Sequence, residues 1–95
     1  MGSSEMIRDH MKITGSVQGV GFRYRAQHLA GLLGVTGWVK NAWDGSVEME
    51  AQGTQDAVNE LLLRINQGTY VQIENVRHTR MPVEEDETGF HILGD

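Results

Sequence analysis

The sequence of 95 residues contains no cysteine. A chain without cysteine forms no disulfide, and it offers neither a thiol nucleophile nor the thiolate ligands of zinc fingers and iron–sulfur clusters. This usage fits the reducing cytoplasm, which is the location we expect for the protein. The fold must therefore be stabilised by the packing of a modest hydrophobic core.

Basic residues are also scarce, because eight Lys and Arg stand against 13 Asp and Glu and give a formal net charge of −5. A general nucleic-acid-binding protein needs clustered basic side chains to neutralise phosphates. No apolar run approaches the roughly 20 residues that span a bilayer, and the N-terminus lacks the basic and apolar segments of a signal peptide. We therefore expect neither a nucleic-acid nor a membrane partner.

The length fits one domain, and a monomer is the expectation at this size. Residues 1–6, which begin Met1-Gly2-Ser3-Ser4, are expected to be disordered or derived from an expression vector, with a native frayed end as the alternative. Residues 7–95 are expected to form the domain.

Hydrophobic periodicity predicts an alternation of strands and helices. Strands are expected over residues 7–17, 35–41, 46–52, 71–83 and 90–93, and helices over residues 22–33 and 54–67. Gly34 and Gly68 are expected to end the helices, Gly34 in a left-handed conformation. Thr54 is a candidate N-cap, and Asp44-Gly45 predicts a hairpin turn between the second and third strands.

The order of these elements is β-α-β-β-α-β with a short extra strand. This order predicts an α+β fold, the ferredoxin-like βαββαβ sandwich, in which a mostly antiparallel sheet carries two helices on one face. The strand over 71–83 is polar and is expected to lie at an edge or to be partly exposed, and Glu84–Glu87 is expected to form a solvated loop. Because this fold hosts many unrelated functions, the function must be argued from a site.

The first strand is expected to be half-buried, with two chemically different faces. The inner face would carry apolar residues (Ile7, Met11, Ile13 and Val17), and the outer face polar ones (Arg8, His10, Lys12 and Thr14).

The segment Gly15–Arg23 runs from this strand into the first helix and is rich in glycine. Glycines let backbone N–H groups approach a ligand closely, and the unpaired N–H groups at a helix start attract anions. Such turns also occur in purely structural roles, so the segment alone is weak evidence for a site.

Two arginines in the first helical turn, Arg23 and Arg25, strengthen the interpretation. A positive charge there opposes the helix dipole, at about 0.3–1 kcal/mol each. A bound anion would remove this conflict, and a guanidinium can hold phosphate or carboxylate with two parallel hydrogen bonds. Because the two side chains point to different sides of the helix, we expect Arg23 to face the loop and Arg25 to be solvated.

The second strand ends in Trp38-Val39-Lys40-Asn41. Asn41 alone could be a hairpin residue that tolerates turn geometry; Trp38 is expected to pack, and Lys40 to face solvent. The four histidines show no metal-ligand spacing and no evident pairing with a carboxylate. A cross-strand pair of His10 and His91 remains open.

Two long segments together resemble the signatures of the acylphosphatase family. Ile13–Arg23 matches the first signature at every defined position, and Gly37–Val47, followed by Gly53, matches the second. The resemblance covers essentially the whole chain after the first few residues.

The resemblance implies hydrolysis of the carboxyl–phosphate bond of small acyl phosphates, without a metal ion or other cofactor. In the catalytic site, Arg23 would bind the phosphate and Asn41 would orient the attacking water. Backbone N–H groups of the loop would cradle the phosphate, those of Gln18, Gly19, Val20, Gly21, Phe22 and Arg23.

The same signature also occurs at the N-terminus of large hydrogenase-maturation carbamoyltransferases. Two other functions compete with this interpretation. A binding module could keep the anion pocket without turnover. An RNA-binding domain shares the sheet-and-helix plan, but it would need exposed aromatic residues and basic surroundings.

Overall fold

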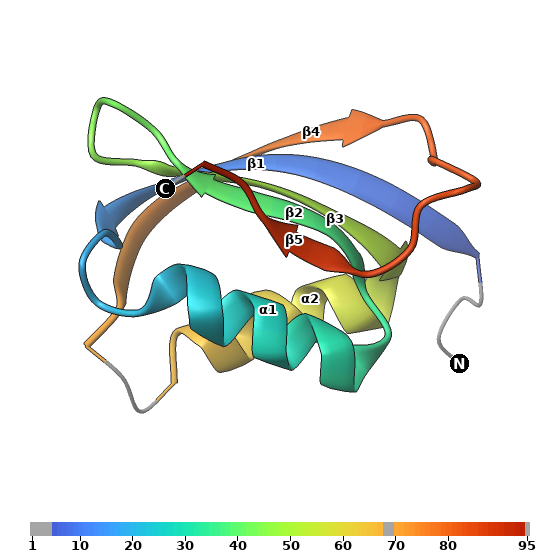
Figure 1. Ribbon diagram of the computed structural model, residues 1–95, viewed down its shortest axis with the longest axis horizontal. Coiled ribbons are helices and arrows are strands. Elements are labelled where there is room, and N and C mark those ends of the chain that lie inside the picture. The colour runs from blue at the N-terminus through green and yellow to red at the C-terminus, as the bar shows by residue number, and fades with distance from the viewer. Residues whose placement is uncertain (1–4, 68–69, 95) are drawn as a thin grey trace.

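The computed structural model describes residues 5–67 and 70–94, and in these residues a five-stranded sheet carries two helices on one face (Figure 1). The elements are β1 (Met6–Ser16), α1 (Phe22–Leu33), β2 (Thr36–Asn41), β3 (Val47–Thr54), α2 (Gln55–Ile65), β4 (Gln72–Met81) and β5 (Phe90–Ile92). All the predicted elements are present, with boundaries shifted by at most two residues.

The strand order is β4-β1-β3-β2-β5. Neighbouring strands are antiparallel except for β2 and β5, which are parallel. The prediction of a ferredoxin-like α+β fold is therefore confirmed, as is the edge position of β4, whose residues are largely exposed.

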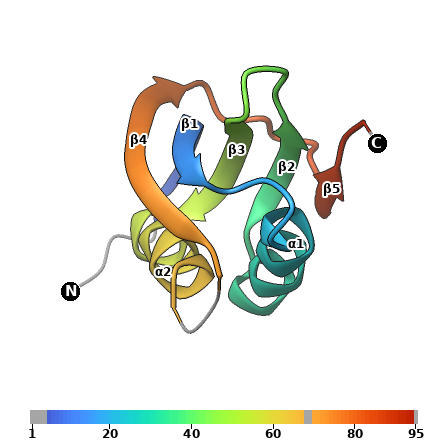
Figure 2. The ribbon, with the colours of Figure 1, turned by 90° about the vertical axis from the view of Figure 1, so that its left-hand side faces the viewer.

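Both helices lie on the same side of the sheet, α1 beneath β2 and β5 and α2 beneath β3, β1 and β4 (Figure 2). Each helix turns one apolar face towards the sheet. The buried helical residues are Phe22, Ala26, Leu29 and Ala30 from α1 and Val58, Leu61 and Ile65 from α2. They pack against inward-facing strand residues, chiefly Met11, Ile13, Val39, Val47, Met49 and Ala51.

The helix ends follow the sequence signals. Gly34 adopts a left-handed conformation after α1, and its N–H donates to the carbonyl of Ala30. The Thr54 side chain accepts a hydrogen bond of 3.1 Å from the N–H of Ala57, so it caps α2 as predicted. Helix α2 ends at Ile65, and the predicted stop at Gly68 lies outside the described residues.

Strand β1 begins at Met6, which pairs with Thr54. Backbone pairing to β3 thus carries the sheet one residue into the segment predicted to be disordered. Residues 1–4 lie outside the described residues, so the nature of that segment stays a prediction.

The polar face of β1 contains a buried cation that the alternation did not predict. Arg8 lies on that face but is only 3% exposed. Its guanidinium contacts Glu50 on β3 and Glu87 in the loop before β5, each at 2.7 Å. Burial lowers the pKa of Arg8, but the hydrogen bonds that its guanidinium donates to the two carboxylates, together with their negative charges, outweigh that effect and raise the pKa, so Arg8 remains charged.

The acidic loop is not simply solvated, which corrects the prediction for Glu84–Glu87. The Gln52 side chain accepts a hydrogen bond of 2.7 Å from the N–H of Glu84 and donates one of 2.9 Å to the Glu84 carbonyl. With the Arg8–Glu87 ion pair, these bonds fasten the loop to the open face of the sheet.

The histidines also differ from the sequence expectation. His10 contacts the carboxylate of Glu50 at 2.8 Å, a pair that the spacing did not reveal. The cross-strand pair of His10 and His91, which the sequence left open, does not form. His10 lies on β1 and His91 on β5, and β3 and β2 lie between these strands.

No helix in residues 5–67 and 70–94 is long and apolar enough to cross a membrane.

Candidate active site

The glycine-rich loop leads into α1 through left-handed backbone. Gly19 and Gly21 have φ angles of 73° and 81°, which glycine adopts without the strain that a Cβ atom would cause. Gly21 is the N-cap of α1, where no side chain caps the helix and no acidic residue lies in the first turn. The N–H groups at the N-terminus of α1 therefore have neither a capping side chain nor an acidic side chain as a partner, and a bound anion could take that place.

A hollow of about 170 Å³ brings Arg23 and Asn41 together. Arg23 belongs to the first turn of α1, and Asn41 is the last residue of β2. The lining consists of Val17, Gly19, Gly21, Phe22, Arg23, Tyr24 and Asn41. It provides a guanidinium, a carboxamide and the N-terminus of a helix, without any carboxylate or imidazole. Such a lining is suited to an anion.

Two residues of the predicted cradle, Gln18 and Val20, do not line this hollow. Val20 packs against the core. The side-chain amide of Gln18 donates to the carbonyls of Ala42 and Ser46, at 2.7 and 2.8 Å. The loop and the β2–β3 turn thereby meet at one end of the molecule (Figure 1). Sequence reasoning treated Gln18 only as backbone and missed this link.

The turn after Asn41 is held by Asp44. This carboxylate accepts hydrogen bonds from the N–H and the hydroxyl of Ser46, at 3.0 and 2.6 Å, and it pairs with Lys12 of β1 at 2.8 Å. The hydrogen bond from Lys12, followed by those from Ser46, holds the pKa of Asp44 well below its usual range. Trp43, at the tip of the same turn, is 98% exposed.

Arg25 does not point into solvent, which corrects the prediction. Its guanidinium donates to the carbonyls of Arg64, Ile65 and Gln67, at 2.8, 3.3 and 3.0 Å. These carbonyls lie at the C-terminal end of α2, which carries partial negative charge. Arg25 therefore joins the two helices, and only Arg23 lines the hollow.

Trp38 and Lys40 lie on the open face of the sheet. Trp38 is half-buried and packs edge-on against His10, with ring centroids 5.8 Å apart, in line with the predicted packing role. Lys40 is half-buried rather than free in solvent, because its ammonium lies 5.5 Å from the Trp38 ring centroid and 3.5 Å from Glu48.

In the part of the chain that the structure describes, no group of three or more His, Cys, Asp or Glu residues is placed to hold a metal ion.

Comparison with known proteins first places this fold among small phosphatases of known structure. The acylphosphatase of Bacillus subtilis superposes with a TM-score of 0.83 at 31% sequence identity, over 93% of this chain and 99% of that one. The acylphosphatase of Clostridium acetobutylicum is 43% identical over 93% of this chain and 98% of the relative. The acylphosphatase of Geobacillus thermodenitrificans is 46% identical over 93% of this chain and 95% of the relative.

The family model for acylphosphatases matches residues 9–92. The chain therefore belongs to the acylphosphatase family, as its two signature segments predicted.

Proposed function

We propose that this protein hydrolyses acyl phosphates to a carboxylate and inorganic phosphate without a metal ion, with Arg23 binding the phosphate and Asn41 orienting the water. Membership of the acylphosphatase family makes the chain a hydrolase that acts on acyl phosphates. The assignment of roles to individual residues and the absence of a metal requirement are our proposal.

The observation that carries the proposal is the shared hollow. Arg23 and Asn41 come from different elements, yet both line the same space of about 170 Å³ at the start of α1. A phosphate group held there would have the guanidinium on one side and the carboxamide within the same enclosure. Phosphoryl transfer depends mainly on such positioning and on charge stabilisation.

In the proposed complex, the Arg23 guanidinium holds two phosphate oxygens by parallel hydrogen bonds. Backbone N–H groups of residues 18–23 bind the remaining charge, helped by the dipole of α1. The anion also relieves the conflict between Arg23 and the positive end of that helix.

The Asn41 carboxamide orients a water molecule in line with the phosphorus–oxygen bond that breaks. The water oxygen bonds to phosphorus, the carboxylate leaves with the electron pair of the broken bond, and one water proton passes to a phosphate oxygen. Asparagine is too weak a base to take this proton, so the phosphate of the substrate must accept it.

The chemistry of the leaving group supports a metal-free reaction. A carboxylate is a stable anion and needs little stabilisation as it departs. The hollow contributes its positive charge through Arg23 and helix N–H groups, and its lining offers no carboxylate ligand to a cation.

The absence of cysteine supports a cytoplasmic location, and the size of the chain supports a monomer.

The direct test is hydrolysis of benzoyl phosphate in the presence of a chelator, comparing the wild-type chain with Asn41→Ala. We expect fast turnover by the wild type and a loss of at least about a hundredfold in kcat for the variant, because the water is no longer positioned. Phosphate binding, measured by calorimetry, should stay within about threefold, since Arg23 and the loop are intact.

Asn59→Ala is the matched control, because Asn59 is an exposed asparagine of α2 outside the hollow. It should retain wild-type turnover. A folded wild-type chain that binds phosphate without hydrolysis would overturn the proposal and favour a binding module. Turnover that the chelator abolishes would overturn the metal-free part alone.

A further inference from the structure

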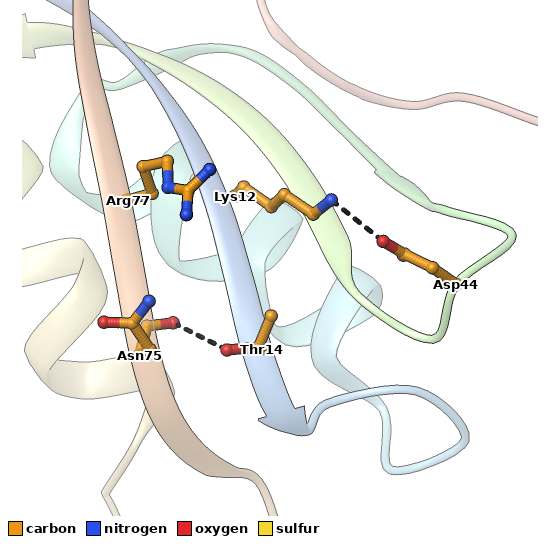
Figure 3. Close-up of a pocket in the computed structure, with 5 residues that line it drawn as sticks. All are labelled: Lys12, Thr14, Asp44, Asn75 and Arg77. Atoms are coloured by element: carbon orange, nitrogen blue, oxygen red, sulfur yellow. Dashed lines mark hydrogen bonds and ion pairs between the residues drawn. The ribbon is translucent and has the colours of Figure 1, made fainter.

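A second hollow, of about 250 Å³, lies on the open face of the sheet, away from the helices. It is lined by Lys12 and Thr14 of β1, Asn75 and Arg77 of β4, and Asp44 of the β2–β3 turn (Figure 3). None of these residues lines the hollow that contains Arg23 and Asn41.

The charges in this second hollow are not balanced. Lys12 and Arg77 are direct partners across the antiparallel β1–β4 pair, and like charges directly opposite each other destabilise a sheet. Lys12 reaches away from Arg77 to Asp44, at 2.8 Å (Figure 3). The Arg77 guanidinium makes no hydrogen bond or ion pair within residues 5–67 and 70–94. The acid on the other side of Lys12, Glu48, contacts Lys40 at 3.5 Å.

Uncharged donors lie beside the unbalanced cation. Thr14 and Asn75 are partners two register positions further along, the next pair on the same face of the sheet. The threonine hydroxyl donates to the backbone carbonyl of Asn75 at 3.5 Å, and both residues line the hollow. A β-bulge follows between Thr14 and Gly15. Gly15 has a φ of 130°, and a Cβ atom there would lie 2.1 Å from the Gln72 carbonyl oxygen, so only glycine fits. Bulges of this kind re-aim side chains next to functional sites.

We propose that this hollow is a second binding site for a small oxyanion, a phosphate or a carboxylate. Arg77 is its principal ligand through a two-point grip, with Lys12 nearby and the Thr14 hydroxyl and Asn75 amide as further donors. The anion balances the like-charged pair. This site does not depend on the proposed hydrolysis, because it uses different residues.

An anion in this site also competes with Asp44 for Lys12. Asp44 holds Ser46 of the turn, and the Ser46 carbonyl accepts from Gln18 in the glycine-rich loop. Binding at the sheet is therefore transmitted to the turn, and the Ser46 amide provides a reporter of that effect.

The test is a titration with inorganic phosphate, followed through backbone amide resonances. Arg23→Gln protein is used, so that binding at the candidate active site is weakened. We expect saturable shifts of the amides of Thr14, Asn75 and Arg77, and of Ser46. Adding Arg77→Gln should raise the dissociation constant for these shifts at least about tenfold, because a charged hydrogen-bond donor is lost.

Lys40→Gln is the matched control, since it removes one positive charge from the same face outside the hollow. It should leave the dissociation constant unchanged. The proposal is wrong if no saturable shift appears, or if Arg77→Gln and Lys40→Gln weaken binding equally, which would indicate general surface charge. A parallel titration with acetate distinguishes a general oxyanion site, which responds to both anions, from a phosphate site. The test measures binding and not turnover, so its failure is distinguishable from failure of the hydrolysis proposal.

Discussion

Arg23 and Arg25 are neighbouring arginines with different surroundings. Arg23 lines the hollow shared with Asn41, whereas Arg25 binds the end of α2. We predict that Arg23→Lys lowers kcat/KM for benzoyl phosphate at least about tenfold, because an ammonium cannot reproduce the planar two-point grip. Arg25→Lys keeps a cation at the end of α2 and should retain near-wild-type kcat/KM. Equal activities of the two variants would remove Arg23 from its proposed role.

Asp44 gives a prediction about pH. Its folded-state pKa lies below the unfolded value of about 3.9, because of hydrogen bonds from Lys12 and Ser46. A depressed carboxyl pKa contributes stability above the unfolded pKa, and that stability is lost as the pH falls through the folded pKa. The difference in free energy of unfolding between wild type and Asp44→Asn should therefore be full at pH 6 and smaller at pH 3. Urea unfolding at the two pH values measures it, and a constant difference would contradict the prediction.

Between elements, the contact of Arg25 with α2 explains a positive charge in an unfavourable helical turn. The cost of placing the Arg25 charge at the positive end of α1 is offset at the end of α2, where three carbonyls accept hydrogen bonds from the Arg25 guanidinium. We predict that Arg25→Gln lowers the free energy of unfolding by about 1–2 kcal/mol. Arg64→Gln, which removes an exposed ion pair with Glu60, should lower it by less than about 0.5 kcal/mol. Denaturant unfolding compares them, and equal losses would contradict the bridging role.

The elements themselves were predictable because their signals are local. Alternation gave the strands, the helical spacing gave α1 and α2, and Gly34 and Thr54 marked helix ends a few residues from the groups that they bond. The role of Arg25 was not predictable in this way, since its carbonyl partners lie about 40 residues along the chain. The amide of Gln18 is a similar case, because its acceptors belong to the β2–β3 turn.

On the scale of the whole molecule, the Arg8 network joins β1, β3 and the loop before β5. The Arg8 side chain is 4% exposed, and Glu50 and Glu87 are its carboxylate partners. We predict that Glu87→Gln lowers the free energy of unfolding by about 1–3 kcal/mol, because a buried cation loses one charged partner. Hydrogen exchange in residues 82–89 should accelerate.

Glu85→Gln is the control for this prediction, since Glu85 is exposed in the same loop. Glu85→Gln should change the free energy of unfolding by no more than about 0.5 kcal/mol. Equal effects of the two variants would show that the Arg8–Glu87 ion pair contributes little to stability. Sequence patterning placed Arg8 on the polar face of β1 but could not reveal its burial, because the covering loop follows about 80 residues later.

The two tryptophans of the chain occupy opposite environments. Trp38 is half-buried in the sheet beside His10, whereas Trp43 projects almost fully exposed from the turn that follows Asn41. An indole already in water changes its emission little when the chain unfolds, whereas one leaving a packed sheet shifts to longer wavelength. Intrinsic fluorescence should therefore report unfolding through Trp38, and a Trp38→Phe chain should leave Trp43 as an optical probe for ligands that arrive beside the turn.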